Sequence, residues 1–94
     1  MKANELGTGK VDEISLEIID KGDEREVRTR YGGSRVCDAI GKDETGQVNL
    51  ALWNEEIDKI EVGIKIKITN GYAKEWRGAP QLSAGRYGKL EVVD

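Results

Sequence analysis

The stretch that decides the fold is 47-QVNLALW-53, which follows the turn sequence 43-DETG-46. Successive side chains of a β-strand point to opposite faces. The aliphatic residues Val48, Leu50 and Leu52 therefore share one face, which we assign to a hydrophobic core. Trp53 lies on the other face, so this pattern predicts a strand that carries a tryptophan directed away from the core.

Upstream of this strand, the chain alternates in short bursts that are broken by glycines. Isoleucine and leucine at alternating positions of residues 14–18 predict a first strand. We expect residues 21–23 to break it and a second extended arm to follow. The glycines of residues 31–33 predict a hairpin tip, after which residues 36–40 resume as a strand.

Downstream, residues 54–60 predict a short helix in which Asn54 caps the N-terminus and the isoleucines face inward. Isoleucines alternate with lysine or threonine along residues 64–69, as expected for a fourth strand. Residues 72–80 then predict a long hairpin, and residues 81–84 predict the start of a fifth strand.

These five strands, with a helix between the third and fourth, predict an all-β fold, a five-stranded Greek-key OB-fold barrel. A chain of 94 residues has the length of one domain. We therefore expect residues 1–94 to form a single OB-fold domain. In such barrels, the face of strands two and three and the flanking loops bind oligonucleotides.

The composition argues against several other classes of protein. Cys37 is the only cysteine and the chain has no histidine, so an internal disulfide and the usual zinc, haem and Cys/His catalytic sets are excluded. The chain also has no glycine-rich phosphate loop and no apolar run of membrane-spanning length. We therefore expect no enzymatic activity, no metal, no cofactor and no membrane partner, and a cytoplasmic location.

Positive charge is concentrated in two stretches, although the net charge of the chain is −3. Local charge governs the binding of a polyanion because salt screens distant charges within about 10 Å. We expect the following basic residues to contact phosphates: Arg28, Arg30, Arg35, Lys74, Arg77 and Arg86.

The aromatic residues fall where an OB fold would offer them to a nucleic-acid strand. An aliphatic core leaves Trp53, Tyr72, Trp76 and Tyr31 available for other roles. Nucleobases stack on aromatic rings whatever their identity, which gives roughly 1–3 kcal/mol per base. We therefore predict that these four side chains stack on the bases of a nucleic acid.

The order of these motifs resembles the simple single-stranded-DNA-binding proteins of archaea and animals, and the DNA-binding OB domains of archaeal replication protein A. The resemblance is carried by 43-DETG-46, the strand that ends in Leu52-Trp53, 70-NGYAKEWRG-78 and 81-QLSAGR-86. It implies base-stacking roles for Trp53, Tyr72 and Trp76. At Ser83 some relatives of this family carry a further aromatic residue.

The resemblance implies sequence-tolerant binding of single-stranded DNA in replication, repair or recombination. It further implies that this chain is one OB domain of a longer replication protein A-like protein, with other replication or repair proteins as partners. Two alternatives stay open, an RNA-binding OB domain and a protein-interaction OB domain whose exposed tryptophans form an interface.

Overall fold

The computed structural model describes residues 1–30, 32–85 and 87–93. A short 3-10 turn (Ala3–Glu5) precedes six strands and one helix. The elements are β1 (Gly9–Thr29), β2 (Gly32–Asp43), β3 (Gly46–Trp53), α1 (Glu55–Lys59), β4 (Lys65–Trp76), β5 (Ala79–Ser83) and β6 (Lys89–Val92).

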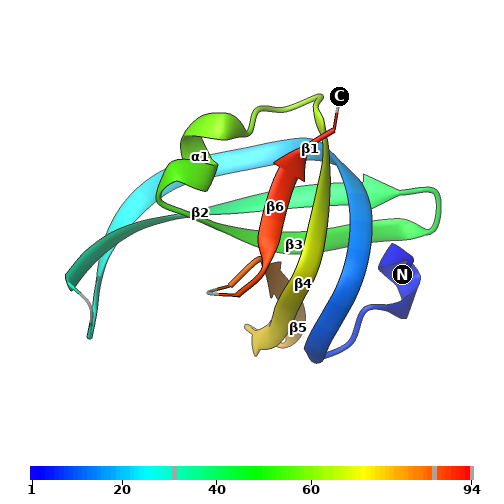
Figure 1. The fold of residues 1–94 in the computed structure, drawn as a ribbon, viewed down its shortest axis with the longest axis horizontal. Helices are drawn as coiled ribbons and strands as arrows, with labels where there is room; N and C mark the ends of the chain where they lie inside the picture. Colours follow the sequence, from blue (N-terminus) through cyan, green and yellow to red (C-terminus); the bar gives the residue numbers. More distant parts are fainter. Residues whose placement is uncertain (31, 86, 94) are drawn as a thin grey trace.

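The strands form one sheet in the order β1-β2-β3-β5-β4-β6, and an additional pairing of β1 with β4 closes it into a barrel. The first part of β1 pairs antiparallel with β4 and its later part pairs with β2, so that β1 curves through both halves of the barrel (Figure 1). β3 and β5 pair in parallel. The predicted all-β barrel with a helix between β3 and β4 is confirmed.

The strand count differs from the prediction because the end of the chain adds a sixth strand. β6 pairs antiparallel with β4, with Ile66 opposite Val92 and Thr69 opposite Lys89. β6 has only four residues and follows a glycine-containing turn. A pattern this short does not distinguish a strand from an irregular segment.

The core is aliphatic and is filled by the inward side chains of the strands. Val48, Leu50 and Leu52 of β3 are all at most 3% exposed, as their alternation predicts. Ile57 and Ile60, which flank the end of α1, close the core from one side with exposures of 5% and 0%. α1 is the only α-helix among the described residues, and no helix there is long enough to span a membrane.

The expected strand break at residues 21–23 is wrong. β1 continues to Thr29 and pairs with β2 along this stretch, with register shifts between Ile18 and Asp20 and between Lys21 and Glu24. A Cβ atom at Gly22 would lie 3.2 Å from the carbonyl oxygen of Asp38, so glycine permits this close approach. The glycine therefore marks a β-bulge instead of a strand end, and β1 and β2 extend from the barrel as a paired arm (Figure 1).

The expected helix cap at Asn54 is also wrong. Asn54 makes no side-chain capping hydrogen bond and has a φ of 53°. Its Oδ1 instead accepts a hydrogen bond from the Arg35 N–H (3.0 Å), and its own N–H donates to the Arg35 carbonyl (3.0 Å). Asn54 therefore joins the end of β3 to the β1–β2 arm.

The N-terminal segment is fastened to the β2–β3 turn by Asp43. The carboxylate of Asp43 accepts hydrogen bonds from the Ala3 N–H (2.7 Å), the Thr45 N–H (2.7 Å) and the Thr45 hydroxyl (2.6 Å). These donors, led by the Thr45 side chain, lower the pKa of Asp43 to about 2. Ala3, held in this way, is buried in the core.

Because the pKa of Asp43 is lowered in the folded state, its contribution to stability is complete above the unfolded pKa of about 4. That contribution is lost as the pH falls towards about 2. We therefore expect Asp43→Ala to lower the Tm at pH 7 and to have little effect at pH 2. Thermal unfolding followed by circular dichroism at both pH values measures this.

The matched control is Asp12→Ala, because the Asp12 side chain is 93% exposed and makes only one ion pair, at 3.8 Å, among the described residues. This variant should unfold close to the wild type at both pH values. An Asp43→Ala penalty of equal size at pH 7 and pH 2 would contradict the role assigned to the ionised carboxylate.

Candidate nucleic-acid interface

The outer face of the barrel is set by the register of β2, β3, β4 and β5. Trp53 lies opposite Val36, on the face directed away from the core, as the alternation of β3 predicts. On the neighbouring pair of strands, Tyr72 lies opposite Ser83 and Lys74 lies opposite Gln81. Since β3 pairs with β5, these side chains share one continuous surface.

The floor of this surface is apolar and closely covered. Val36 and Ala51 are 3% and 7% exposed, yet both lie outside the cluster that forms the barrel core. They are therefore buried on the outer face, separately from the core cluster. Val36 lies opposite Trp53 in the β2–β3 register, so Trp53 is next to a second, smaller apolar layer on the outer face.

Two of the predicted stacking residues are strongly exposed on β4. Tyr72 is 51% exposed and Trp76 is 46% exposed, and they lie on one face because they are four residues apart on one strand. Arg77 and Gly78 both have positive φ, 54° and 83°, as expected for a two-residue hairpin turn of type I′. The Arg77 guanidinium lies over the Trp76 ring, 5.5 Å from its centroid.

A small cleft lies between β3, β4 and β5, and we call it the inner cleft. Its volume is about 220 Å³. Its lining combines two aromatic rings with polar side chains and comprises Ala51, Trp53, Tyr72, Lys74, Gln81, Ser83 and Gly85. The structure thus brings together two predicted stacking residues and one predicted phosphate contact.

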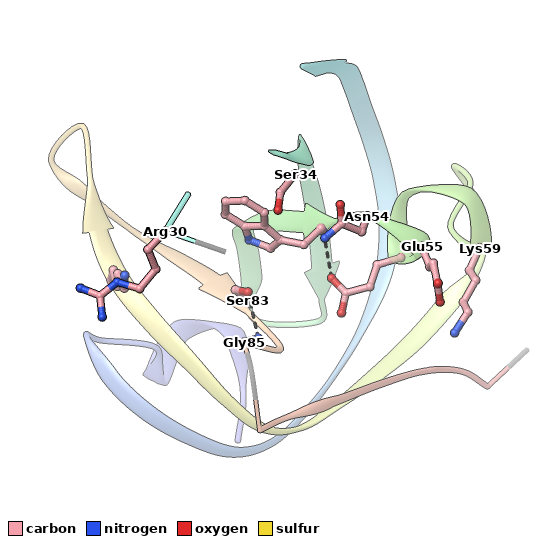
Figure 2. A pocket seen from close by; sticks show the side chains of 10 residues that line it. Arg30, Ser34, Asn54, Glu55, Lys59, Ser83 and Gly85 are labelled. Atoms are coloured by element: carbon pink, nitrogen blue, oxygen red, sulfur yellow. Dashed lines mark hydrogen bonds between the residues drawn. The ribbon is translucent and has the colours of Figure 1, made fainter. Parts of the chain in front are cut away.

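A larger and more open depression, which we call the outer groove, shares Trp53 with the inner cleft and has a volume of about 1060 Å³. Arg30 lies at one end of it, and Glu55 and Lys59 of α1 lie at the other (Figure 2). The outer groove also includes Lys74, so it adds Arg30 to the predicted residues that the structure brings together.

Other predicted site residues lie elsewhere. Neither the inner cleft nor the outer groove is lined by Arg28, which lies on the arm. The same is true of Trp76 and Arg77, which lie at the tip of the β4–β5 hairpin. Tyr31 and Arg86 lie outside the described residues.

Arg35 differs from the other predicted phosphate contacts because carboxylates already surround it. Its guanidinium contacts Asp58 of α1 at 3.0 Å and Glu24 of β1 at 3.2 Å. The hydrogen bond and charge of Asp58 raise the pKa of Arg35, and Arg35 in turn lowers the pKa of Asp58. Together with the Asn54 contacts, these ion pairs connect the β1–β2 arm to α1, the helix that follows Trp53 in the chain.

The sequence predicts only that Glu56 belongs to the short helix of residues 54–60, and it does not indicate the contact that Glu56 makes. Its Oε1 accepts a hydrogen bond from the Trp53 N–H at 3.0 Å. Burial raises the pKa of Glu56, an effect that the Trp53 N–H opposes. Glu56 is the second residue of α1, whereas the glutamate of a capping box is the third, so the usual sequence pattern does not indicate this contact.

A polar bridge across the outer face was also missed. Asp38 accepts hydrogen bonds from Gln81 Nε2 (3.1 Å) and from Arg25 Nη1 (3.2 Å). Asp38 and Gln81 are 43 residues apart, and they come from strands on either side of β3. No local pattern in the sequence indicates such a contact.

Comparison with known proteins gives concordant results for sequence and fold. Residues 9–92 match the model of a family described as single-stranded DNA binding protein Ssb-like, OB fold. The chain is 31% identical over 77 residues to the single-stranded DNA binding protein Ssb of Saccharolobus solfataricus, covering 82% of this chain and 52% of that protein. The chain therefore spans about half the length of this curated relative.

Solved structures with lower identity share the fold. The OB domain of a Thermoplasma acidophilum protein has a TM-score of 0.85 at 17% identity, covering 100% of this chain and 86% of that one. The second OB-fold domain of replication protein A from Methanococcus maripaludis has a TM-score of 0.76 at 22% identity, covering 100% and 94%.

The family match covers nearly the whole barrel, from the first residue of β1 to the last residue of β6. The matched family is one of DNA-binding OB folds and not a family of enzymes. The chain belongs to the Ssb-like family of single-stranded DNA binding proteins with an OB fold.

Proposed function

We propose that this domain binds single-stranded DNA with little sequence preference by stacking bases on Trp53, Tyr72 and Trp76, with Tyr31 as a further predicted platform. The observation that carries the proposal is the inner cleft, where the rings of Trp53 and Tyr72 line one cavity together with Lys74. A cation beside stacked rings can neutralise a phosphate next to a stacked base.

The basic side chains around the aromatic surface support this mode of binding. Arg30 and Lys74 line the outer groove beside Trp53, and Arg77 lies against Trp76 at the hairpin tip. Arg28 lies on the same arm as Arg30, and neither forms an ion pair with a described residue. We propose that these four residues contact phosphates.

Arg35 and Arg86 complete the set of predicted phosphate contacts. For Arg35, a phosphate would have to compete with Asp58 and Glu24, so its share of the binding free energy should be smaller.

We further propose that the domain works in DNA replication, repair or recombination, in the cytoplasm of an archaeal-type cell, as one part of a longer replication protein A-like protein. The aligned region covers 82% of this chain but only 52% of the curated relative, which supports this proposal. Domains joined by a linker bind one strand with an affinity well above that of each alone, because the second binding step becomes intramolecular.

The test is a titration with oligo-dT followed by tryptophan fluorescence at low salt. We expect quenching and a micromolar Kd, and a plot of log K against log salt with a slope near −2 to −3 if three or four phosphates are neutralised. Duplex DNA of the same length should bind poorly, because its bases are already stacked on each other and cannot reach the rings.

Two outcomes would contradict the proposed function. Unchanged fluorescence together with no binding at low salt would mean that the aromatic face does not receive DNA. A strong preference for oligo-rU over oligo-dT of equal length would instead indicate an RNA ligand.

A further inference from the structure

The hydrogen bond between Asp38 and Gln81 crosses β3 on the outer face of the barrel, the face that carries Trp53 and Tyr72. Asp38 lies on β2 opposite Ala51, and Gln81 lies on β5, on the other side of β3. The small side chain of Ala51 lets the two polar groups meet above it at 3.1 Å. Ala51 itself is 7% exposed.

This contact fixes which way the Gln81 amide points. An ionised carboxylate only accepts hydrogen bonds, so the NH₂ group of Gln81 must face Asp38. Arg25 Nη1, 3.2 Å from the second oxygen of Asp38, donates a hydrogen bond that holds the carboxylate in place. The Oε1 atom of Gln81 is therefore a fixed acceptor, and it receives no hydrogen bond from the described residues.

Ser83 supplies a donor on the same strand face. Its Oγ accepts a hydrogen bond from the Gly85 N–H at 3.0 Å, which leaves the hydroxyl proton available for another acceptor (Figure 2). Gln81 and Ser83 are two residues apart on β5, so their side chains project from the same face about 7 Å apart. Both line the inner cleft with Trp53 and Tyr72.

We propose that Gln81 and Ser83 read the edge of a base in the inner cleft, and that they prefer a ring N–H beside a carbonyl, the edge that thymine presents. Gln81 Oε1 accepts from thymine N3–H, and the Ser83 hydroxyl donates to the neighbouring carbonyl. Asp38 is a positioning residue that keeps the acceptor of Gln81 directed to the base. This inference rests on the proposed function, because it requires a base in the cleft.

Comparing a dT oligomer with the same oligomer carrying N3-methylthymine tests the inference on the wild-type protein. The methyl group removes the N–H donor and leaves a stackable ring. We expect the methylated oligomer to bind about fivefold more weakly, which is the effect of one neutral hydrogen bond. It should still quench tryptophan fluorescence, because stacking persists.

The variants separate base reading from general binding. In Gln81→Ala, which also makes room for the methyl group, the two oligomers should bind equally. Asp38→Asn should reduce the ratio of the two affinities, because asparagine allows the Gln81 amide to turn over. Gln47→Ala is the matched control, since Gln47 is exposed at the start of β3 and lines neither cleft nor groove.

Equal binding of both oligomers to the wild type would overturn the inference and leave the proposed function standing. Undiminished discrimination in Gln81→Ala would overturn it as well. Failure of the wild type to bind the unmodified oligomer would instead refute the proposed function itself.

Discussion

Replacing Trp53 with alanine is expected to weaken binding of single-stranded DNA about 10- to 100-fold, the loss of one good base-stacking platform. Trp53 should be the most sensitive of the aromatic residues because its ring lines both the inner cleft and the outer groove. Tyr72 lines only the inner cleft, and Trp76 lines neither.

The position of the Trp53 ring adds to this effect. Its backbone is held by Glu56 on one side and, through Asn54, by Arg35 on the other. Its side chain is half-buried, next to Val36 across the β2–β3 pairing. A ring that is already ordered loses little conformational entropy when a base stacks on it, so more of the stacking free energy contributes to binding.

The measurement is the dissociation constant of oligo-dT at fixed low salt, by fluorescence anisotropy of a labelled oligomer. Tyr87→Ala serves as the matched aromatic control, because Tyr87 is 82% exposed and lines neither cleft nor groove. Trp53→Ala should unfold within a few degrees of the wild type, since Trp53 lies outside the barrel core. Equal losses of affinity in the two variants would mean that the binding face is misplaced.

The direction of Trp53 could be predicted from the sequence because β3 is a regular strand with no bulge. Where a strand keeps a period of two, a single buried residue fixes the side of every other residue. Tyr72 and Trp76 likewise share one face of β4, because they are four residues apart on one strand. In a regular strand, the residues that are buried in the core thus determine which residues lie on the outer surface.

The prediction failed where a tertiary contact changed the local geometry. Gly22 was interpreted as a strand end, but the pairing of β1 with β2 continues past it through a bulge. Asn54 was interpreted as a cap, but its side chain bonds to the backbone of Arg35 instead. In both cases the local geometry depends on a contact with β2, which is too far away in the sequence for the local pattern to indicate it.

The groups proposed to read the base were missed for a related reason. Gln81 and Asp38 are ordinary polar residues on the outward positions of their strands, and such residues usually contact only solvent. Their meeting depends on the parallel pairing of β3 with β5 and on the small size of Ala51 between them. A strand order that brings β5 beside β3 is a property of the closed barrel, and alternation alone does not specify it.

Gly88→Ala is expected to lower the free energy of unfolding by about 3 kcal/mol, at the upper end of the cost of inserting a methyl group into a packed site. A Cβ atom at Gly88 would lie 2.0 Å from the Ala84 carbonyl oxygen and 2.6 Å from the Asn70 carbonyl oxygen. Both neighbours are backbone atoms, so no rotation of a side chain can relieve the overlap. The segment leading into β6 would have to move away from β4.

The two residues that a methyl group at Gly88 would displace are both held firmly in the barrel. Asn70 has a φ of 57°, and its Nδ2 donates a hydrogen bond to the Tyr87 carbonyl at 3.3 Å. Ala84 is buried at 2% exposure directly after β5. Displacing either of them also disturbs Ser83 and Gly85, which line the inner cleft. We therefore expect weaker DNA binding as well, even below the Tm of the variant.

Thermal unfolding of Gly88→Ala should show a Tm about 15 °C below that of the wild type, given the usual entropy of unfolding of a domain of this size. Gly7→Ala is the matched control, because a Cβ atom there would meet nothing within 4 Å and its φ is not in the positive range. That variant should unfold at the wild-type temperature or slightly above it, since alanine restricts the unfolded chain. Equal Tm values for the two variants would contradict this prediction. The segment before β6 would then be able to move away from Ala84 and Asn70 at little cost in free energy. In that case β6 would be a loosely attached strand instead of a fixed part of the barrel.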